Sequence, residues 1–174
     1  VFSMSNTAKS ANLLKSAICA TNVKHRPKPT LFYFPGLKSK PFHERDESNF
    51  PWIKFLESNV STISEEYLNL VKNNALSDYE TSSEHKLHSG SWDWHSYILK
   101  GKRVEKFKKM CPQTADILDS IPDLMTGIPM AYAFFSTLYS NSEIKPHTAA
   151  CNLRIRCHLP LFVPNEKMDI CGIR

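Results

Sequence analysis

The most strongly patterned stretch of the chain is PHTAACNLRIRCHLPL, at residues 146–161. Because side chains of a strand alternate between two faces, we predict a strand over residues 152–163 with one apolar and one polar face. The apolar face would carry Leu153, Ile155, Cys157, Leu159 and Leu161. The polar face would carry Asn152, Arg154, Arg156 and His158, with His147 just ahead of the strand.

The polar face admits two interpretations. A sheet with one buried and one solvated face shows the same alternation without any binding function. Alternatively, Arg154, Arg156 and His158 line the inside of a barrel and bind a ligand that carries a carboxylate, for which the planar fork of arginine is suited. A lone histidine such as His147 is more often structural than a metal ligand, so the pattern alone leaves both interpretations open.

Charge is distributed unevenly along the 174 residues, whose formal net charge is +5. Residues 1–43 hold seven Lys or Arg and no Asp or Glu, whereas the remainder is slightly acidic. We therefore do not expect a nucleic-acid-binding surface on the folded part. Residues 1–28 have the composition either of a basic tail or docking arm or of an organellar transit peptide, which would place the protein in a mitochondrion or plastid.

The remaining composition is that of one soluble domain over residues 29–174. No apolar stretch is long enough to be a transmembrane segment. The five cysteines are odd in number and form no Cys-x-x-Cys pair, which favours a reducing intracellular compartment over a disulfide framework or a zinc site.

The order of predicted elements is that of an α+β fold with its sheet towards the C-terminus. Apolar spacing predicts one helix from about residue 50 to residue 72, with Ser48 or Asn49 as its cap and Pro51 in its first turn. A loop is expected at residues 73–90. A strand at residues 91–99, a helix at 114–120 and strands at 130–139 and 153–163 follow. In the first of these strands, Trp92, Trp94 and Tyr97 are interpreted as core residues, with a binding face as the alternative.

The run PHTAACNLRIRCHLPLFVP, with AFFSTLYSNSEI ahead of it, resembles the signature of the aspartyl/asparaginyl β-hydroxylase domain, Pro-His-x-Gly-x-x-Asn-x-Arg-x-Arg-x-His-Leu. LFYFPGL, FPWIKFLESN, the Trp-rich strand and CPQTADILDSIP also occur in the family's order, so the resemblance covers residues 29–174. It implies a double-stranded β-helix, a cupin-like jelly roll preceded by helices. It also implies an Fe(II)- and 2-oxoglutarate-dependent dioxygenase that hydroxylates a peptidyl Asp or Asn or a small molecule.

The same resemblance assigns roles to individual residues. His147 matches the first iron-binding histidine. Arg156 and His158 match the residues that hold the 2-oxoglutarate carboxylate beside the metal, and Ser136 matches a serine that holds its far carboxylate. Arg154 matches an arginine that faces the substrate.

Two departures from the usual oxygenase pattern bear on catalysis. Most 2-oxoglutarate oxygenases have a carboxylate ligand two residues after the first histidine, where this chain has Ala149. The resembled family usually has Gly there and uses two histidines, and related halogenases place a halide in the vacancy. The second iron histidine and the arginine that anchors 2-oxoglutarate are expected beyond Arg174, together with the second half of the jelly roll.

Three interpretations follow from this expectation. The chain is an incomplete record of an active hydroxylase, or it is a catalytically inactive accessory or structural subunit in which a protein partner covers the open sheet edge. In the third interpretation, the basic arm binds nucleic acid or an acidic surface, and the barrel has no part in the function.

Overall fold

The computed structural model describes residues 32–34, 36–37, 40–80, 88–164 and 172–173. The basic arm at residues 1–28 lies outside these ranges, so its two interpretations stay predictions. The chain divides into two compact units. One comprises Val1–Glu44 with Lys145–Arg156, and the other comprises Arg45–Ile144 with Cys157–Arg174.

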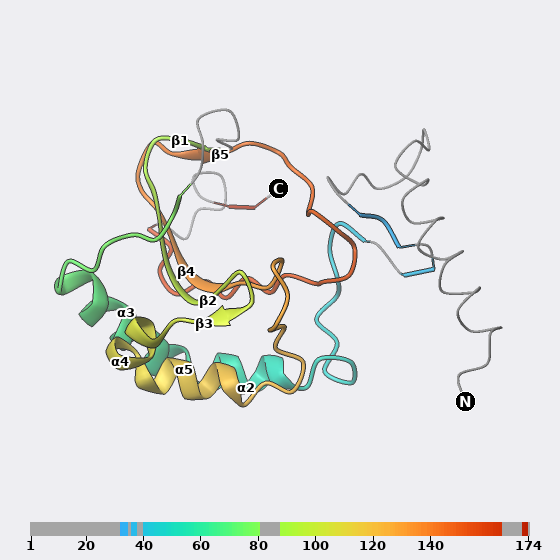
Figure 1. The fold of residues 1–174 in the computed structure, drawn as a ribbon, viewed down its shortest axis with the longest axis horizontal. Helices are drawn as coiled ribbons and strands as arrows, with labels where there is room; N and C mark the ends of the chain where they lie inside the picture. The colour runs from blue at the N-terminus through green and yellow to red at the C-terminus, as the bar shows by residue number, and fades with distance from the viewer. Residues whose placement is uncertain (1–31, 35, 38–39, 81–87, 165–171, 174) are drawn as a thin grey trace. The chain divides into compact units, whose positions relative to one another are not determined.

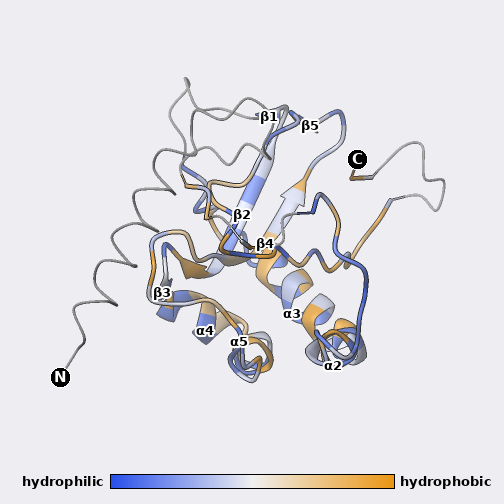
Figure 2. Ribbon diagram, turned by 90° about the vertical axis from the view of Figure 1, so that its right-hand side faces the viewer, coloured by the Kyte–Doolittle hydropathy of each residue, from blue (hydrophilic) through white to orange (hydrophobic). Residues whose placement is uncertain are grey.

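The larger unit is a layer of helices against one face of a small antiparallel sheet (Figures 1 and 2). The sheet has the strand order β3-β2-β4. Its strands are β2 (Trp92–Leu99), β3 (Lys102–Arg103) and β4 (Ala133–Leu138). The helices are α2 (Trp52–Ser58), α3 (Val60–Lys72), α4 (Glu105–Met110) and α5 (Pro112–Asp119). Strands β1 (His88–Ser89) and β5 (Glu143–Ile144) form a separate two-stranded ribbon.

The register of β2 with β4 assigns side chains to the two faces of the sheet. Trp94 lies opposite Ser136, and His95 lies opposite Phe135. Since neighbouring side chains of a strand point to opposite faces, Trp94 and Ser136 share one face while His95 and Phe135 share the other. The register shifts between Ser96 and Ile98, where a bulge ends the alternation.

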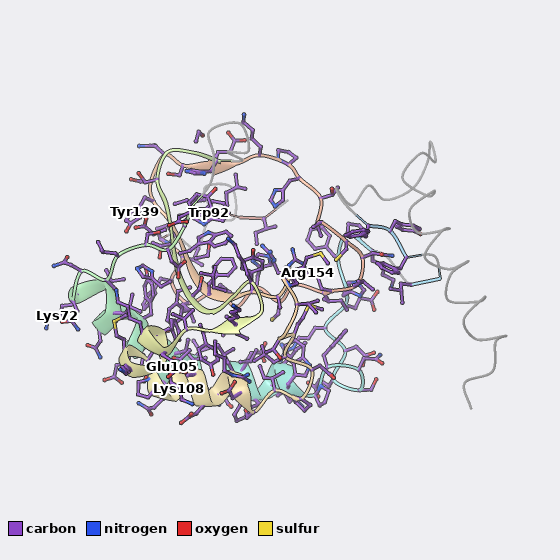
Figure 3. All side chains as sticks on the ribbon, viewed as in Figure 1. Lys72, Trp92, Glu105, Lys108, Tyr139 and Arg154 are labelled. Atoms are coloured by element: carbon purple, nitrogen blue, oxygen red, sulfur yellow. The ribbon has the colours of Figure 1, made fainter. Side chains whose placement is uncertain are left out.

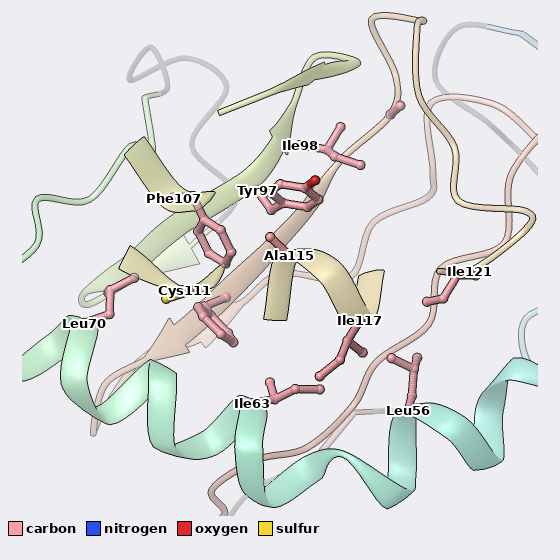
Figure 4. Packing of buried hydrophobic residues seen from close by; sticks show 12 residues of the cluster. Leu56, Ile63, Leu70, Tyr97, Ile98, Phe107, Cys111, Ala115, Ile117 and Ile121 are labelled. Atoms are coloured by element: carbon pink, nitrogen blue, oxygen red, sulfur yellow. The ribbon is translucent and has the colours of Figure 1, made fainter. Parts of the chain in front are cut away.

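The core lies between the helices and the His95 face of the sheet (Figure 4). Phe107 of α4 contacts both strands, with ring centroids 5.5 Å from Tyr97 and 5.4 Å from Phe135. Tyr97 and Ile98 are fully buried. Burying a large apolar side chain stabilises the fold by about 1.5–3 kcal/mol. The helices contribute Leu56, Ile63, Leu70, Phe107, Cys111, Ala115 and Ile117.

The single helix predicted from residue 50 to residue 72 is wrong in one respect, because the structure has two helices that meet at Asn59. This residue leaves helical geometry (φ −102°, ψ 8°), and its side-chain amide donates to the Phe55 carbonyl over 2.8 Å. An asparagine side chain competes in this way with the helical backbone ladder. The predicted caps Ser48 and Asn49 are also wrong, since Pro51 occupies the cap position and makes no side-chain hydrogen bond there.

The other predicted elements agree more closely with the structure. The strands expected at residues 91–99 and 130–139 are confirmed as β2 and β4, and the second helix begins at Pro112. The loop expected at residues 73–90 ends in β1, so its last part was wrong. The α+β class is confirmed. In the ranges that the structure describes, the strands do not close into a barrel.

Glu66 is a buried carboxylate that joins α3 to the start of α5. It accepts hydrogen bonds from the backbone N–H groups of Gln113, over 3.0 Å, and Thr114, over 2.7 Å. Two of the N–H groups that every helix leaves unpaired in its first turn are therefore satisfied from another helix. Burial, reinforced by the charge of Glu66, raises the pKa of Cys111 to about 12, so this thiol stays protonated and packs as an apolar group.

We predict that Glu66→Ala lowers the free energy of unfolding by about 2–4 kcal/mol, because it leaves two N–H groups without acceptors at a buried site. The matched control is Glu65→Ala, on an exposed neighbour in the same helix, which should change stability by less than about 0.5 kcal/mol. Urea unfolding followed by circular dichroism measures both. Equal losses in the two variants would contradict the capping role.

Candidate functional site

The face of the β2–β4 pair that points away from the helices carries a cluster of aromatic rings, here called the aromatic face. Trp94 stacks on Phe134 with ring centroids 4.1 Å apart and planes at 19°. Tyr79 contacts both Trp92, at 4.8 Å, and Trp94, at 4.9 Å. His88 packs edge-on against Trp92. The prediction that Trp92, Trp94 and Tyr97 are core residues is therefore confirmed only for Tyr97. The two tryptophans lie on the opposite face of the sheet.

Ser136 lies on the aromatic face, and Trp92 fixes the role of its hydroxyl group. The indole Nε1–H of Trp92 donates to Ser136 Oγ over 2.8 Å. An indole nitrogen can only donate, so Ser136 Oγ accepts this bond and keeps its own hydrogen for another acceptor. Ser136 is exposed. The arrangement presents a hydroxyl donor to a ligand that carries oxygen acceptors.

Trp94 supplies a second donor on the same face. Its Nε1 atom is buried, and no acceptor reaches it within the part of the chain that the structure describes. A buried N–H group without a partner costs about 1–3 kcal/mol, which an acceptor that reached the group would offset. Two donors on one face suit a carboxylate, which only accepts hydrogen bonds when ionised.

The family resemblance indicated Ser136, but neither it nor the residue pattern predicted the hydrogen-bonding roles of Trp92 and Trp94. The missing information was the register, which places Trp94 directly opposite Ser136 and Trp92 two positions further along, opposite Leu138. A two-residue period shows which residues of one strand share a face. It does not show which residues of another strand they meet.

Residues 77–79 hold the free edge of β2 beside the aromatic face. The Trp94 N–H donates to Ser77 Oγ over 3.0 Å, and the Asp78 N–H donates to the Trp94 carbonyl over 2.9 Å. The Asp78 carboxylate then accepts from both the N–H and the hydroxyl of Ser96. This segment satisfies strand-edge groups that would otherwise be unpaired, and it brings Tyr79 onto the two tryptophans.

His147 belongs to the smaller unit and is exposed. Its Nδ1 lies 2.8 Å from the Lys145 carbonyl oxygen. A carbonyl oxygen only accepts, so Nδ1 carries the hydrogen, and in the neutral ring Nε2 presents a lone pair. A backbone carbonyl on the second ring nitrogen is the usual support of a metal-binding histidine. The tautomer therefore fits the role of metal ligand that the resemblance implies.

Asn152 ties the His147 segment to residues 32–34 within the same unit. Its amide nitrogen donates to the Phe34 carbonyl over 2.9 Å, and its amide oxygen accepts from the Phe34 N–H over 2.8 Å. The Phe32 N–H donates to the Ala150 carbonyl over 3.0 Å, beside a parallel bridge from Phe32 to Cys151. Asn152 therefore acts as a backbone clip, which its predicted place on a polar strand face did not suggest.

The strand predicted for residues 152–163 is not formed. Leu153 and Ile155 are 41% and 53% exposed, whereas Arg154 is half-buried. The alternation is therefore wrong at this end of the stretch. A strand needs a neighbour for its backbone groups, and in the described residues the pairing ends at Cys151. Further along, Leu159 and Leu161 pack on the core as predicted.

The predicted site residues are divided between the two units. His147, Arg154 and Arg156 belong to the smaller unit, and Ser136 and His158 belong to the larger one. Arg156 and His158 are exposed. Among the described residues, no three His, Cys, Asp or Glu side chains are grouped closely enough to hold a metal ion. His147 fits one ligand position, and a complete centre needs ligands from outside these residues.

A family model described as Aspartyl/Asparaginyl beta-hydroxylase matches residues 57–174. The chain therefore belongs to the aspartyl/asparaginyl β-hydroxylase family, as the signature around His147 predicted. No helix in the described ranges is long and apolar enough to cross a bilayer.

Curated relatives agree with this membership. Aspartate beta-hydroxylase domain-containing protein 2 of Homo sapiens is 32% identical over 141 residues, which are 79% of this chain and 37% of that protein. The protein of the same name in Mus musculus is 30% identical over 79% of this chain and 40% of its own length. Aspartyl/asparaginyl beta-hydroxylase of Homo sapiens is 29% identical over 81% of this chain and 18% of its own length. The chain thus spans less than half the length of these relatives.

We predict that the effects of Trp92→Phe and Ser136→Ala on stability are not additive. Each variant removes one partner of the same hydrogen bond. Once the bond is broken, the second substitution therefore lowers the free energy of unfolding by less than it would alone. The coupling in a double-mutant cycle should be about 0.5–1.5 kcal/mol, measured by urea unfolding. A cycle of Trp92→Phe with Ser140→Ala, on an exposed serine beyond β4, is the control and should show additivity. Additivity in both cycles would contradict the bond.

Proposed function

We propose that the chain contributes part of the site of an Fe(II)- and 2-oxoglutarate-dependent hydroxylase that acts on a peptidyl Asp or Asn or on a related small molecule. The observation that carries the proposal is the pair of donors on the aromatic face. The hydroxyl hydrogen of Ser136 is available because Oγ accepts from Trp92, and the buried Nε1–H of Trp94 is without an acceptor in the described residues. A dicarboxylate such as 2-oxoglutarate supplies the oxygens that these donors require.

Iron and 2-oxoglutarate, when bound, supply the means to place one oxygen atom of O2 on a substrate carbon and the other on the succinate product. The chain's own residues bind and orient. His147 Nε2 would hold the metal, while the Lys145 carbonyl keeps the proton on Nδ1. Ser136 binds the far carboxylate of the cosubstrate through its hydroxyl hydrogen.

The arginines and His158 complete the proposed assignment. Arg156 and His158 bind the cosubstrate carboxylate beside the metal, where a guanidinium can donate two parallel hydrogen bonds. Arg154 faces the substrate and suits a substrate that carries a carboxylate. Ala149 has no donor atom, so it leaves a coordination position to water or to another ligand. We also propose the double-stranded β-helix, supported by the family membership, as the architecture that unites these residues in the whole protein.

We predict that His147→Ala abolishes the iron-dependent conversion of 2-oxoglutarate to succinate, because the variant loses the one ligand that the described residues supply. The matched control is His43→Ala, on an exposed histidine of the same unit, which should keep the activity of the unaltered protein. Succinate release in the presence of Fe(II) and O2 is the measurement.

Two outcomes would contradict this proposal. Activity retained in His147→Ala would remove His147 from the metal site. Absence of turnover in a protein that also includes the remaining metal ligands, with 2-oxoglutarate binding intact, would instead support the accessory subunit that the sequence leaves as the alternative.

A further inference from the structure

Positive charge in the larger unit is concentrated on β3, α4 and the turn that precedes them. Residues 100–109 have the sequence KGKRVEKFKK, with six basic residues and one acidic residue. The rest of residues 45–144 holds four basic residues and thirteen acidic ones. The basic residues of this part of the chain are therefore concentrated in one run of ten residues, and its other residues are mainly acidic.

One of these six basic residues, Arg103, differs from the other five because its side chain forms an ion pair. Arg103 donates from Nε to Asp119 over 2.9 Å and forms an ion pair through Nη2 at 2.8 Å. The Tyr97 hydroxyl also donates to Asp119, over 2.5 Å. Burial alone would raise the pKa of Asp119, but the bonds from Arg103 and Tyr97 outweigh it and lower that pKa. This arginine therefore serves the fold.

The other five charges are lysines, and we call them the lysine surface. They are all exposed, and none of their side chains forms an ion pair or hydrogen bond in the described part of the chain, although the charge of Lys108 helps to lower the pKa of Asp119. Lys108 and Glu105 both project from α4 (Figure 3). The lysine surface comprises Lys100, Lys102, Lys106, Lys108 and Lys109.

The backbone that carries the lysine surface is held firmly. At the turn, the Gly101 N–H donates to the Ala131 carbonyl and the Gly127 N–H donates to the Gly101 carbonyl, each over 2.9 Å. A Cβ atom at Gly101 would lie 2.4 Å from the Ile128 carbonyl oxygen, so the turn fits closely against this loop. On α4, Phe107 is 3% exposed and anchors the helix in the core.

Lys100 occupies a backbone conformation that lysine rarely adopts. Its φ is +51°, in the left-handed region that Gly and Asn enter at lower cost. The tight turn between β2 and β3 requires this conformation, which costs a residue other than Gly on the order of 1 kcal/mol. A lysine at this position adds charge to the tip of the turn.

We propose that the lysine surface is a docking site for a short run of Asp and Glu residues in a polypeptide. The lysine side chain is flexible and ends in a point charge. It can therefore reach the carboxylates of an acidic segment in several conformations of that segment. An extended polyanion, such as duplex nucleic acid or an anionic membrane, would cover more of this unit, whose residues outside 100–109 carry thirteen acidic and four basic side chains over 45–144, and would be repelled by that excess of acidic charge. Residues 100–109 also present no exposed aromatic ring on which a base could stack, since Phe107 is buried.

Lysines on a short edge strand can also act only to prevent aggregation. This role would account for Lys102 on β3. It does not account for Lys106, Lys108 and Lys109, which lie on a helix. The docking proposal concerns binding alone and does not depend on the proposed hydroxylase activity.

The test is fluorescence anisotropy with a labelled peptide of consecutive glutamates, titrated with the full chain at low and at high salt. The variant Lys102→Gln/Lys106→Gln/Lys109→Gln should bind the peptide roughly tenfold more weakly than the unaltered chain. The control variant Lys40→Gln/Arg45→Gln/Lys54→Gln loses the same net charge elsewhere and should bind as the unaltered chain does. High salt should weaken binding by the unaltered chain.

Three results would overturn the proposal. The lysine-surface variant could bind the peptide as well as the unaltered chain does. The control variant could lose as much affinity, which would make the attraction a matter of net charge. Duplex DNA or vesicles of anionic lipid could bind more tightly than the peptide, which would assign the surface to a different class of partner.

Discussion

The pairing of β2 with β4 is the constraint on which the rest of the larger unit depends. One register places His95 and Phe135 against the helices and places Trp94 and Ser136 on the opposite face. A slip of one residue would exchange the two faces, exposing core side chains and burying the donors of the aromatic face. Packing of the helices and presentation of the donors are therefore consequences of the same set of backbone contacts.

In the smaller unit, hydrogen bonds hold both ends of the segment that carries His147. Asn152 satisfies the backbone of Phe34, and the Lys145 carbonyl sets the tautomer of His147. The first contact joins residues 118 positions apart and the second is local, and neither needs a regular strand. Part of the motif's residue pattern is thus explained by support of the chain around the histidine.

Much of the secondary structure and the family could be predicted from the sequence, because helical spacing and the run around His147 are local signals. The break at Asn59 could not, since a competing side-chain hydrogen bond interrupts a pattern that is otherwise continuous. Alternation over residues 152–163 predicted a strand, but alternation supplies no partner for the backbone. Predicting the hydrogen-bond donors of Trp92 and Trp94 would have required the strand register, which pairs residues more than forty positions apart.

The register of β2 with β4 can be tested by the α-proton contact between Trp94 and Ser136 in a nuclear Overhauser spectrum. The Trp94 N–H and carbonyl both bond to residues 77–78, away from β4, so Trp94 and Ser136 form a non-hydrogen-bonded antiparallel pair. The α carbons of such a pair are about 4.5 Å apart, which brings their protons into close contact. We predict a strong cross-peak between these two protons. A strong cross-peak from Trp94 to the α proton of Phe135 or Thr137 instead would show a slipped register and would contradict the account.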